Sequence, residues 1–114
     1  MFYRNCNIAA KDKESRYIYC NENVAEAAGL DSPQQAVGKT DHQFCWHDQA
    51  DFYCLCDRKV IYHDWVQVNQ PEIQARPSGI AKILVSKNKL CDRLGHTIGI
   101  IASYIEVSNS RPIK

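Results

Sequence analysis

Residues 16–30 read RYIYCNENVAEAAGL, and we interpret the rest of the chain outward from this stretch. Its first part, Tyr17–Cys20, is aromatic and β-branched, as strands usually are, and the residues that follow are rich in helix formers. Asn21 or Asn23 can accept hydrogen bonds from the free N–H groups of the first helical turn, and Gly29 suits the left-handed end of a helix. We therefore expect a strand that passes directly into a capped helix.

The composition is that of one compact domain. The chain has 114 residues, 45% of them hydrophobic, so we expect a single domain over residues 1–114. The 14 Lys and Arg residues and 13 Asp and Glu residues leave a net charge of +1 without a basic stripe, so direct nucleic-acid binding is not expected. No apolar run approaches the roughly 20 residues of a membrane span, and no signal peptide follows Met1, so no membrane attachment is expected.

Six cysteines occur at irregular spacing, most of them inside apolar segments. This is typical of reduced thiols that pack as small buried hydrophobes, and it predicts a cytoplasmic protein. A secreted disulfide framework is the alternative, which the lack of a signal peptide disfavours. The six are Cys6, Cys20, Cys45, Cys54, Cys56 and Cys91.

A hairpin is expected at the start of the chain. Asn5–Ala10 is a short apolar-leaning run, and Lys11–Ser15 has the charge and small size of a tight turn before Tyr17–Cys20. Because side chains alternate along a strand, Ile18 and Cys20 would share one face, and this smaller pair is expected to face the core.

The middle of the chain has helical patterns. Ser32 followed by Pro33, with a glutamine three residues after the serine, predicts a short capped helix that ends at Gly38. Asp41 belongs to the next turn and cap. Asp48–His63 is the longest helical pattern, with Asp48 as N-cap, and it places on or near one face Phe52, Leu55, Cys56, Lys59, Val60 and His63.

The last part of the chain is rich in strands. Val66–Gln74 and Ile80–Ser86 flank a turn at Pro77–Gly79, and a second turn at Gly95 leads into Ile98–Val107. Two strands, then helices, then three strands indicate an α+β fold, in which the helical middle covers one face of a five-stranded antiparallel sheet.

Four segments, in this order, resemble the motifs of a PAS domain. Lys13–Asn21 resembles the family's hairpin motif, with Asn21 at the family's asparagine position, and Val24–Leu30 resembles the next helix. Val37–Asp41, VGKTD, resembles a segment of bacterial members, and Leu90–Ile100 resembles the segment between the last two strands. The resemblance covers nearly the whole chain and implies the PAS fold and a sensory role in bacterial signalling.

Three positions depart from the family's pattern. Ser15 stands where glycine is usual in the first turn, and Lys89 stands where proline is common, and both changes are tolerable. Ile105–Ser108 replaces the Asp-Ile-Thr triplet through which many members pass a signal to the next domain, so that coupling is open here.

Zinc is disfavoured as a cofactor. Cys45, His47, Cys54 and Cys56 offer suitable ligand atoms within twelve residues. Cys54 and Cys56, however, would point roughly 200° apart around a helix axis, so both cannot reach one ion without breaking the helix.

Flavin, haem and catalysis are also disfavoured. Arg4–Cys6 echoes the cysteine motif of light-sensing members, but it precedes the hairpin instead of lying in the helical middle. His63, with His42 and His47 before it, lies where haem-binding members take a ligand, although a histidine near a helix C-terminus can simply complement the helix dipole. No catalytic motif appears, Asp57 is expected on a solvated helix face, and we expect no enzyme.

A cavity between the sheet and the long helix could hold a small ligand. Its candidate lining residues are Ile18, Cys20, Val24, Phe52, Cys56, Val60, Ile83 and Val85. The alternative is that the space is filled by Phe44, Trp46, Phe52, Tyr53 and Leu55. Structural roles in turns and caps are expected for Asn21, Asn23, Gly38, Asp41 and Gly95.

The resemblance implies a sensory module of a bacterial histidine kinase or helix-turn-helix transcription regulator, with an adjoining output domain. Such a module is expected to form a homodimer, to bind a small ligand or a partner, and to relay the signal through its last strand, Ile98–Val107. The alternative is a ligand-free homodimerisation scaffold with a filled core, whose outer sheet face offers Tyr17, Tyr19, Ile101 and Ile105.

Overall fold

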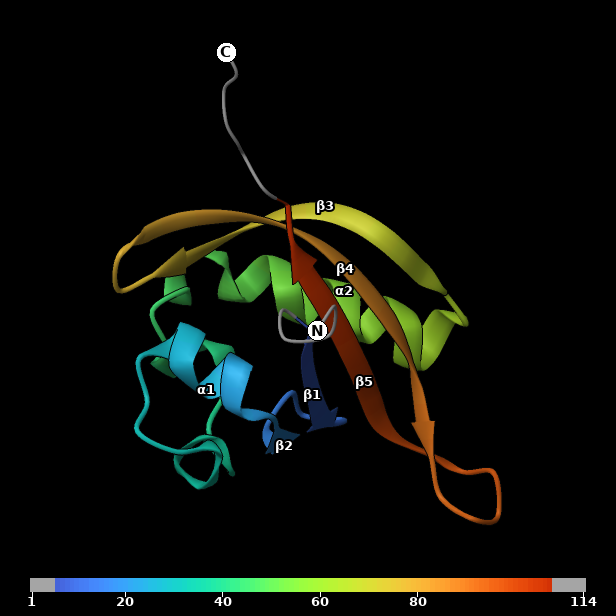
Figure 1. Ribbon diagram of the computed structural model, residues 1–114. Helices are drawn as coiled ribbons and strands as arrows, with labels where there is room; N and C mark the ends of the chain where they lie inside the picture. Colours follow the sequence, from blue (N-terminus) through green and yellow to red (C-terminus); the bar gives the residue numbers. More distant parts are fainter. Residues whose placement is uncertain (1–5, 108–114) are drawn as a thin grey trace.

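The chain folds around a five-stranded antiparallel sheet in the order β2-β1-β5-β4-β3 (Figure 1). We describe it from a computed structural model, in which residues 6–107 are described. The strands are β1 (Asn7–Asp12), β2 (Tyr17–Cys20), β3 (Gln67–Arg76), β4 (Gly79–Cys91) and β5 (Thr97–Glu106). The α+β class and the antiparallel sheet are thus confirmed. Arg4, Asn5 and Ser108, which the sequence analysis used, lie outside the described residues.

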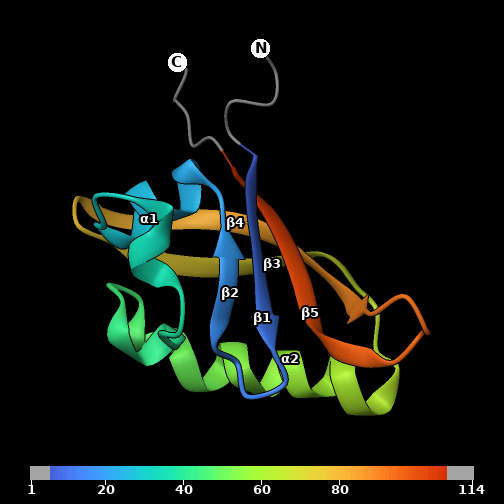
Figure 2. The ribbon, with the colours of Figure 1, turned by 90° about the horizontal axis from the view of Figure 1, so that it is seen from below.

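The helical elements cover one face of this sheet. They are α1 (Glu22–Ala28), α2 (Ala50–His63) and short 3₁₀ helices at Pro33–Ala36, Asp41–Gln43 and His47–Gln49. The sheet curves over α2, which contacts β4 and β5, while α1 contacts β1 (Figures 1 and 2). Among the described residues, no helix has the length and hydrophobicity needed to cross a membrane.

The joint between β2 and α1 forms as the sequence predicts. Asn21 is the N-cap of α1, and its side-chain oxygen accepts a hydrogen bond of 3.1 Å from the Val24 N–H. The side-chain amides of Asn21 and Asn23 both donate to the carbonyl of Cys6, which fixes the joint to the chain just before β1. Gly29 ends the helix with a φ of 81°, as a left-handed cap requires.

The predicted facing of β2 is wrong. Ile18 is 44% exposed, whereas Tyr17 and Cys20 are both buried. The cause is a β-bulge: the register shifts so that Ala10 pairs with Tyr19 and Lys11 pairs with Tyr17, which leaves Ile18 without a register partner. The bulge breaks the strict alternation of side chains, so residues three apart in β2 face the core.

The predicted turn is also shorter than expected. Lys11 and Asp12 belong to β1, where they pair with Ile100 and Gly99 of β5. The turn that follows contains Ser15 with a φ of 62°, a left-handed conformation at the position where the family pattern has glycine.

The helix starts differ from the predicted caps. Ser32 makes no side-chain capping bond at Pro33–Ala36, although proline does occupy the start of that helix. A capping box forms instead at the next 3₁₀ helix, between Thr40 and Gln43. The long helix starts at Ala50, because His47–Gln49 forms a separate 3₁₀ turn, and Asp48 is therefore not its N-cap.

The buried face of α2 is rotated from the predicted face. Phe52 and Leu55 are each 48% exposed, so Phe52 does not face the sheet. Asp57, expected in solvent, is fully buried. The predicted face combined residues of two apolar stripes on this helix. Cys56 and Val60 belong to the buried stripe, which also carries Ala50, Tyr53, Asp57 and Ile61.

Both edges of the sheet are irregular. β2, at one edge, has only four residues. β3, at the other edge, contains Pro71 and a register shift against β4 between Gln67 and Gln70. β4 extends to Cys91, beyond the predicted strand end at Ser86, and the added segment, residues 87–91, begins with Lys87.

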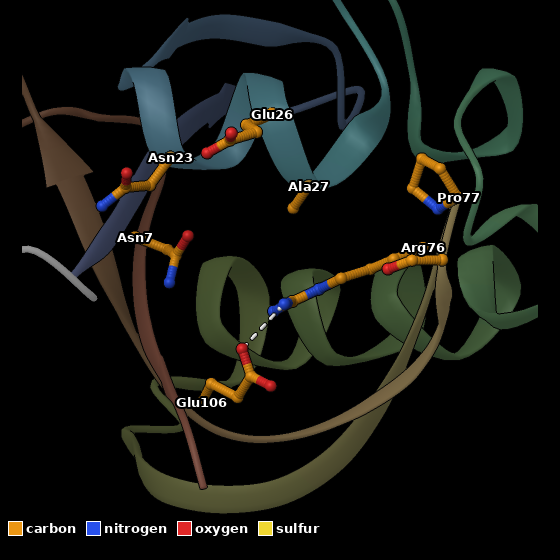
Figure 3. Close-up of a pocket in the computed structure, with 8 residues that line it drawn as sticks. Asn7, Asn23, Glu26, Ala27, Arg76, Pro77 and Glu106 are labelled. Atoms are coloured by element: carbon orange, nitrogen blue, oxygen red, sulfur yellow. Dashed lines mark hydrogen bonds and ion pairs between the residues drawn. The ribbon is translucent and has the colours of Figure 1, made fainter. Parts of the chain in front are cut away.

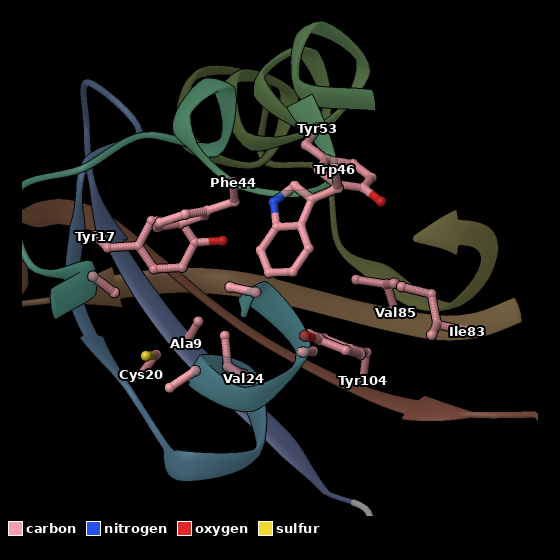
Figure 4. Packing of buried hydrophobic residues seen from close by; sticks show 14 of the residues in the cluster. Ala9, Tyr17, Cys20, Val24, Phe44, Trp46, Tyr53, Ile83, Val85 and Tyr104 are labelled. Atoms are coloured by element: carbon pink, nitrogen blue, oxygen red, sulfur yellow. The ribbon is translucent and has the colours of Figure 1, made fainter. Parts of the chain in front are cut away.

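The main core lies between α1, the start of α2 and the inner sheet face. Tyr17, Phe44 and Trp46 form a row of edge-to-face rings with centroid distances of 5.1 and 5.4 Å (Figure 4). Val60, Ile61, Ile100 and Ala102 form a second, smaller cluster beneath the later part of α2.

Gly99 allows β5 to approach β1. A Cβ atom at this position would lie 1.9 Å from the backbone oxygen of Lys11. Backbone cannot move aside as a flexible side chain can, so only glycine fits while Asp12 and Gly99 remain paired.

We expect Gly99→Ala to lower the free energy of unfolding by about 3 kcal/mol, because β1 and β5 must move apart. Urea unfolding followed by circular dichroism measures this loss. Gly95→Ala is the matched control: Gly95 has a φ of 88° with open space around its Cβ, so only a backbone cost of about 1 kcal/mol is expected. Equal losses in the two variants would contradict the steric explanation.

Candidate ligand-binding site

Four charged side chains meet between the sheet and α2. The ammonium of Lys11, from β1, lies 2.8 Å from Asp41 Oδ2 and 2.7 Å from Asp57 Oδ2. Lys87, from β4, lies 2.8 Å from Asp57 Oδ1. All four side chains are at most 4% exposed. We call Lys11, Asp41, Asp57 and Lys87 the ion network, and its formal charges cancel.

Neutral groups complete the hydrogen bonding of the two carboxylates. Asp41 Oδ1 accepts from the Tyr17 hydroxyl at 2.6 Å and from the Trp46 indole N–H at 2.8 Å. Asp57 Oδ2 accepts from the Ser15 hydroxyl at 3.1 Å. Buried charges are tolerated only with such partners, and these side chains supply them.

The network stabilises the charged forms of Lys11 and Asp57. Burial alone would lower the pKa of Lys11, but Asp41 and Asp57 outweigh burial and raise it. Burial would raise the pKa of Asp57, but Lys11 and Lys87 outweigh it and hold that pKa below its ordinary value. Burial, reinforced by Asp41, raises the pKa of Tyr17, which stays a neutral donor. Lys11 and Asp57 are therefore ionised at neutral pH.

A cavity of about 40 Å³ adjoins the ion network. Pockets for drug-sized ligands measure roughly 300–1,000 Å³, so this cavity holds only a few water-sized groups as it stands. It is lined by Ala9, Lys11, Tyr17, Asp41, Trp46, Tyr53, Glu72, Gln74, Ile83, Val85, Lys87, Ala102 and Tyr104.

Polar groups from β3 and β5 also line the cavity or bond to residues that line it. The Gln74 amide donates to the Tyr104 hydroxyl at 2.9 Å, and the Gln67 amide donates to Glu72 at 3.1 Å. Burial raises the pKa of Glu72, and burial raises that of Tyr104 to about 12. The cavity thus offers donors and acceptors beside apolar walls.

A family model described as the PAS fold matches residues 4–112. The chain belongs to the PAS family. No curated protein matches it.

Several solved structures share this fold. The chain is similar to VqmA of Vibrio cholerae, described as a dimer and among LuxR-type receptors, with a TM-score of 0.83 and 24% identity over 90% of this chain and 46% of that one. For VqmA bound to DPO, the TM-score is 0.82 and the sequence identity is 24%, over 91% of this chain and 53% of that one. The chain therefore spans about half the length of these VqmA chains. The chain is also similar to the PAS domain of a LuxR-family regulator from Burkholderia thailandensis, described in complex with ethanol. The TM-score is 0.65 and the sequence identity is 13%, over 93% of this chain and 92% of that one.

The expected lining residues of this PAS domain are spread over several places. Ile83 and Val85 line the cavity. Cys20 and Val24 are buried in the main core and Cys56 and Val60 on the inner side of α2, but none of these lines it. Ile18 and Phe52 are about half exposed and do not face the interior, because of the bulge in β2 and the rotation of α2.

The expected turn residues hold their positions, with one addition. Gly38 and Gly95 have φ values of 85° and 88°, and the Gly38 N–H donates to the carbonyl of Tyr17. Asp41 begins a 3₁₀ helix as expected, but its carboxylate is also a member of the ion network.

The cysteines and histidines lie apart from the cavity. The Cys45 thiol donates to the carbonyl of Ala28, Cys54 is partly exposed and Cys56 is buried, with its thiol pKa raised by burial. His42, His47 and His63 are exposed, and Cys6 precedes β1.

One side-chain cluster has metal-like spacing. Ligand atoms of Asp41, Cys54 and Asp57 lie within 4.8 Å of one another. The Lys11 ammonium already bonds both carboxylates, so it takes the position that a cation would need. The donor set therefore fits the lysine better than zinc.

A second feature connects the cavity to the end of the last strand. Gln74, in the cavity wall, accepts a hydrogen bond of 2.8 Å from Arg76 Nε, and Arg76 pairs through Nη1 with Glu106 at 2.8 Å (Figure 3). Arg76 and Glu106 also line a surface groove of about 420 Å³ between α1 and the β3–β4 hairpin. The chain of contacts Tyr104, Gln74, Arg76 and Glu106 thus runs from the interior to the surface.

Sequence reasoning missed the ion network and the polar cavity wall. Lys11 was assigned to the turn, Asp57 to solvent, and Lys87 lies beyond the predicted end of its strand. One signal was present: Ile83 and Val85 predict an inward face, and the next residue in that alternation is Lys87.

We expect Asp57→Asn to lower the free energy of unfolding by about 3–5 kcal/mol at neutral pH, because Lys11 and Lys87 lose a shared counter-charge in the interior. Asp31→Asn, the same change at an exposed position, is the control and should leave stability nearly unchanged. Urea titrations measure both.

In the chain without substitutions (the parent chain), acid should remove the stabilisation that ionised Asp57 provides. The folded-state pKa of Asp57 lies below its ordinary value of 3.8, so its contribution is complete above that value and is lost as the pH falls through the folded-state pKa. Asp57→Asn should lose less stability than the parent between neutral pH and roughly pH 3. Parallel acid profiles for the two chains would contradict this role.

Proposed function

We propose that this PAS domain is the ligand-sensing module of a transcription regulator, and that it recognises a small molecule with an apolar body and hydrogen-bonding groups at the cavity beside the ion network. A sensory role of this kind is neither catalytic nor DNA-reading, and it would be exercised in the cytoplasm. The similarity to LuxR-type proteins favours a regulator over a histidine kinase as the parent protein.

The observation that carries this proposal is a set of charged and hydrogen-bonding groups placed around a cavity whose wall is mostly apolar. Well-packed hydrophobic residues stabilise an interior at least as well as buried ion pairs do, so charges at a core cavity call for another reason. Lys87, Glu72 and the Tyr104 hydroxyl surround apolar walls made by Ile83 and Val85. Such a wall suits a compact molecule with hydrogen-bonding groups on a flat apolar body.

The volume limits what can enter without a rearrangement. At about 40 Å³, the cavity must enlarge for any organic ligand. Glu72 and Gln74 belong to β3, which pairs with another strand only on its β4 side, so this wall is the one best able to move. We infer that ligand entry displaces the β3 side chains and not the ion network, whose members hold four separate elements.

DPO is a suitable first probe, because VqmA is described as binding it. We expect titration calorimetry to detect DPO binding to the parent chain, and DPO at about 100 times its dissociation constant to add roughly 2.7 kcal/mol of stability. Ala102→Leu fills the cavity without changing a charge and should abolish binding. Glu72→Gln should weaken it, whereas Glu22→Gln, on the exposed side of α1, is the control and should bind normally.

Two results would count against the proposal. Binding by Ala102→Leu equal to that of the parent would place any ligand elsewhere. A parent chain that does not bind DPO, and that retains no small molecule in native mass spectrometry after purification, would leave the filled-core scaffold as the better reading. The small volume of the cavity is the observation that favours that alternative.

The Gln74–Arg76–Glu106 contacts suggest how binding would be relayed. A ligand that displaces Gln74 would loosen Arg76 from its place and change its pairing with Glu106, at the end of β5. This gives the expected relay through the last strand a specific route, by population shift between two arrangements.

We expect DPO to shift the amide resonances of both Tyr104 and Glu106 in nuclear magnetic resonance spectra of the parent chain. Arg76→Met should bind DPO with similar affinity and keep the Tyr104 shift, but lose most of the Glu106 shift. Arg93→Met, in the β4–β5 turn, is the matched control and should behave as the parent. Identical Glu106 shifts in Arg76→Met and the parent would contradict this route.

A further inference from the structure

α2 has a second apolar stripe that faces away from the sheet. Phe52, Leu55 and Tyr62 are 48%, 48% and 58% exposed. Together with Lys59 they follow the spacing i, i+3, i+7 and i+10, which keeps them within roughly 80° around the helix axis. This is the spacing by which one helix packs against another, and none of these residues contributes to the protein's own core.

The stripe continues beyond the end of α2. Trp65 is 51% exposed, and the ammonium of Lys59 lies 5.7 Å from the centre of its ring. A shallow groove of about 540 Å³ runs along Leu55, Lys59, Tyr62 and Trp65. Large exposed aromatic side chains gathered in one place are typical of protein interaction sites.

The charges beside the stripe are divided along the helix. Asp51 lies in its first turn and Asp48 in the 3₁₀ turn just before it, whereas Arg58, Lys59 and His63 lie in its second half. Asp64, the C-cap, is paired with Lys89. Asp51 and Arg58 are seven residues apart, so they lie on the same flank, about 20° from each other around the axis. The flank is acidic at one end and basic at the other.

We propose that this surface, Phe52, Leu55, Lys59, Tyr62 and Trp65, binds a second copy of the chain, with the two α2 helices antiparallel. A two-fold axis across the middle of α2 lays the acidic end of each helix against the basic end of its partner, whereas a parallel arrangement would oppose like charges. The apolar stripe packs against itself in the same arrangement. In this arrangement Asp51 would lose its contact with His42, and such exposed ion pairs contribute little to stability.

The apolar residues of the outer sheet face are interrupted by polar ones. Ile73, Ile101 and Ile105 are exposed there, and Lys82, Ser86 and Ser103 separate or border them. Figure 2 shows α2 on the side opposite the sheet end where β1 begins and β5 ends. Pairing through α2 therefore leaves Glu106 and the surface groove beside Arg76 uncovered.

Sedimentation equilibrium of the 114-residue chain tests the proposal. We expect a monomer–dimer equilibrium, with a dissociation constant raised about tenfold or more by Leu55→Gln. Ile105→Gln is the matched control, because Ile105 is 47% exposed and Leu55 is 48% exposed, and it should leave the constant unchanged. Circular dichroism confirms that both variants are folded.

A charge exchange tests the antiparallel arrangement separately. Asp51→Arg and Arg58→Asp, each alone, should weaken the dimer about threefold to tenfold, and the double variant should recover most of the parent affinity. A monomeric parent at all concentrations would overturn the proposal, as would a dimer broken by Ile105→Gln and not by Leu55→Gln. Failure of the double variant to recover would overturn the antiparallel arrangement.

Discussion

The pairing of Lys11 with Asp41 and Asp57 is the interaction on which the rest of the structure depends. It joins β1, a 3₁₀ helix and α2 at one ammonium group, and Asp57 extends the connection to Lys87 in β4. A buried charge that loses its partner costs several kcal/mol, so a slip in the register of any of these elements is strongly opposed. The bulge at Lys11 and Tyr17 is part of the same constraint, because it turns both side chains inward.

This constraint also organises the aromatic core. Tyr17 and Trp46 each direct a polar atom to Asp41, so their rings are held in defined positions on either side of Phe44. The ion network and the ring row are therefore not independent layers. One carboxylate orients two of the large side chains that pack the interior, and a cavity of about 40 Å³ adjoins them, with Glu72 and Gln74 of β3 in its wall.

The sequence was sufficient for features that depend on neighbouring residues. The order of elements, the capped joint after β2 and the turns at Gly38 and Gly95 follow from local preferences and were predicted, although the sequence left the N-cap open between Asn21 and Asn23. The facing of Ile18 and Phe52 was predicted wrongly, because a bulge in one strand and a second apolar stripe on α2 override simple periodicity. The ion network was missed because its pairs are 30 to 46 residues apart, and no local rule brings Lys11 to Asp57.

The two irregular edges of the sheet limit how this protein can associate. β2 is very short, and β3 carries a proline, which lacks a backbone N–H, and a break in its register. Strands with these features are poor templates for adding a strand from another molecule, so runaway edge-to-edge aggregation is suppressed. Contacts between copies must then be made by side chains, on faces whose composition evolution can adjust one residue at a time.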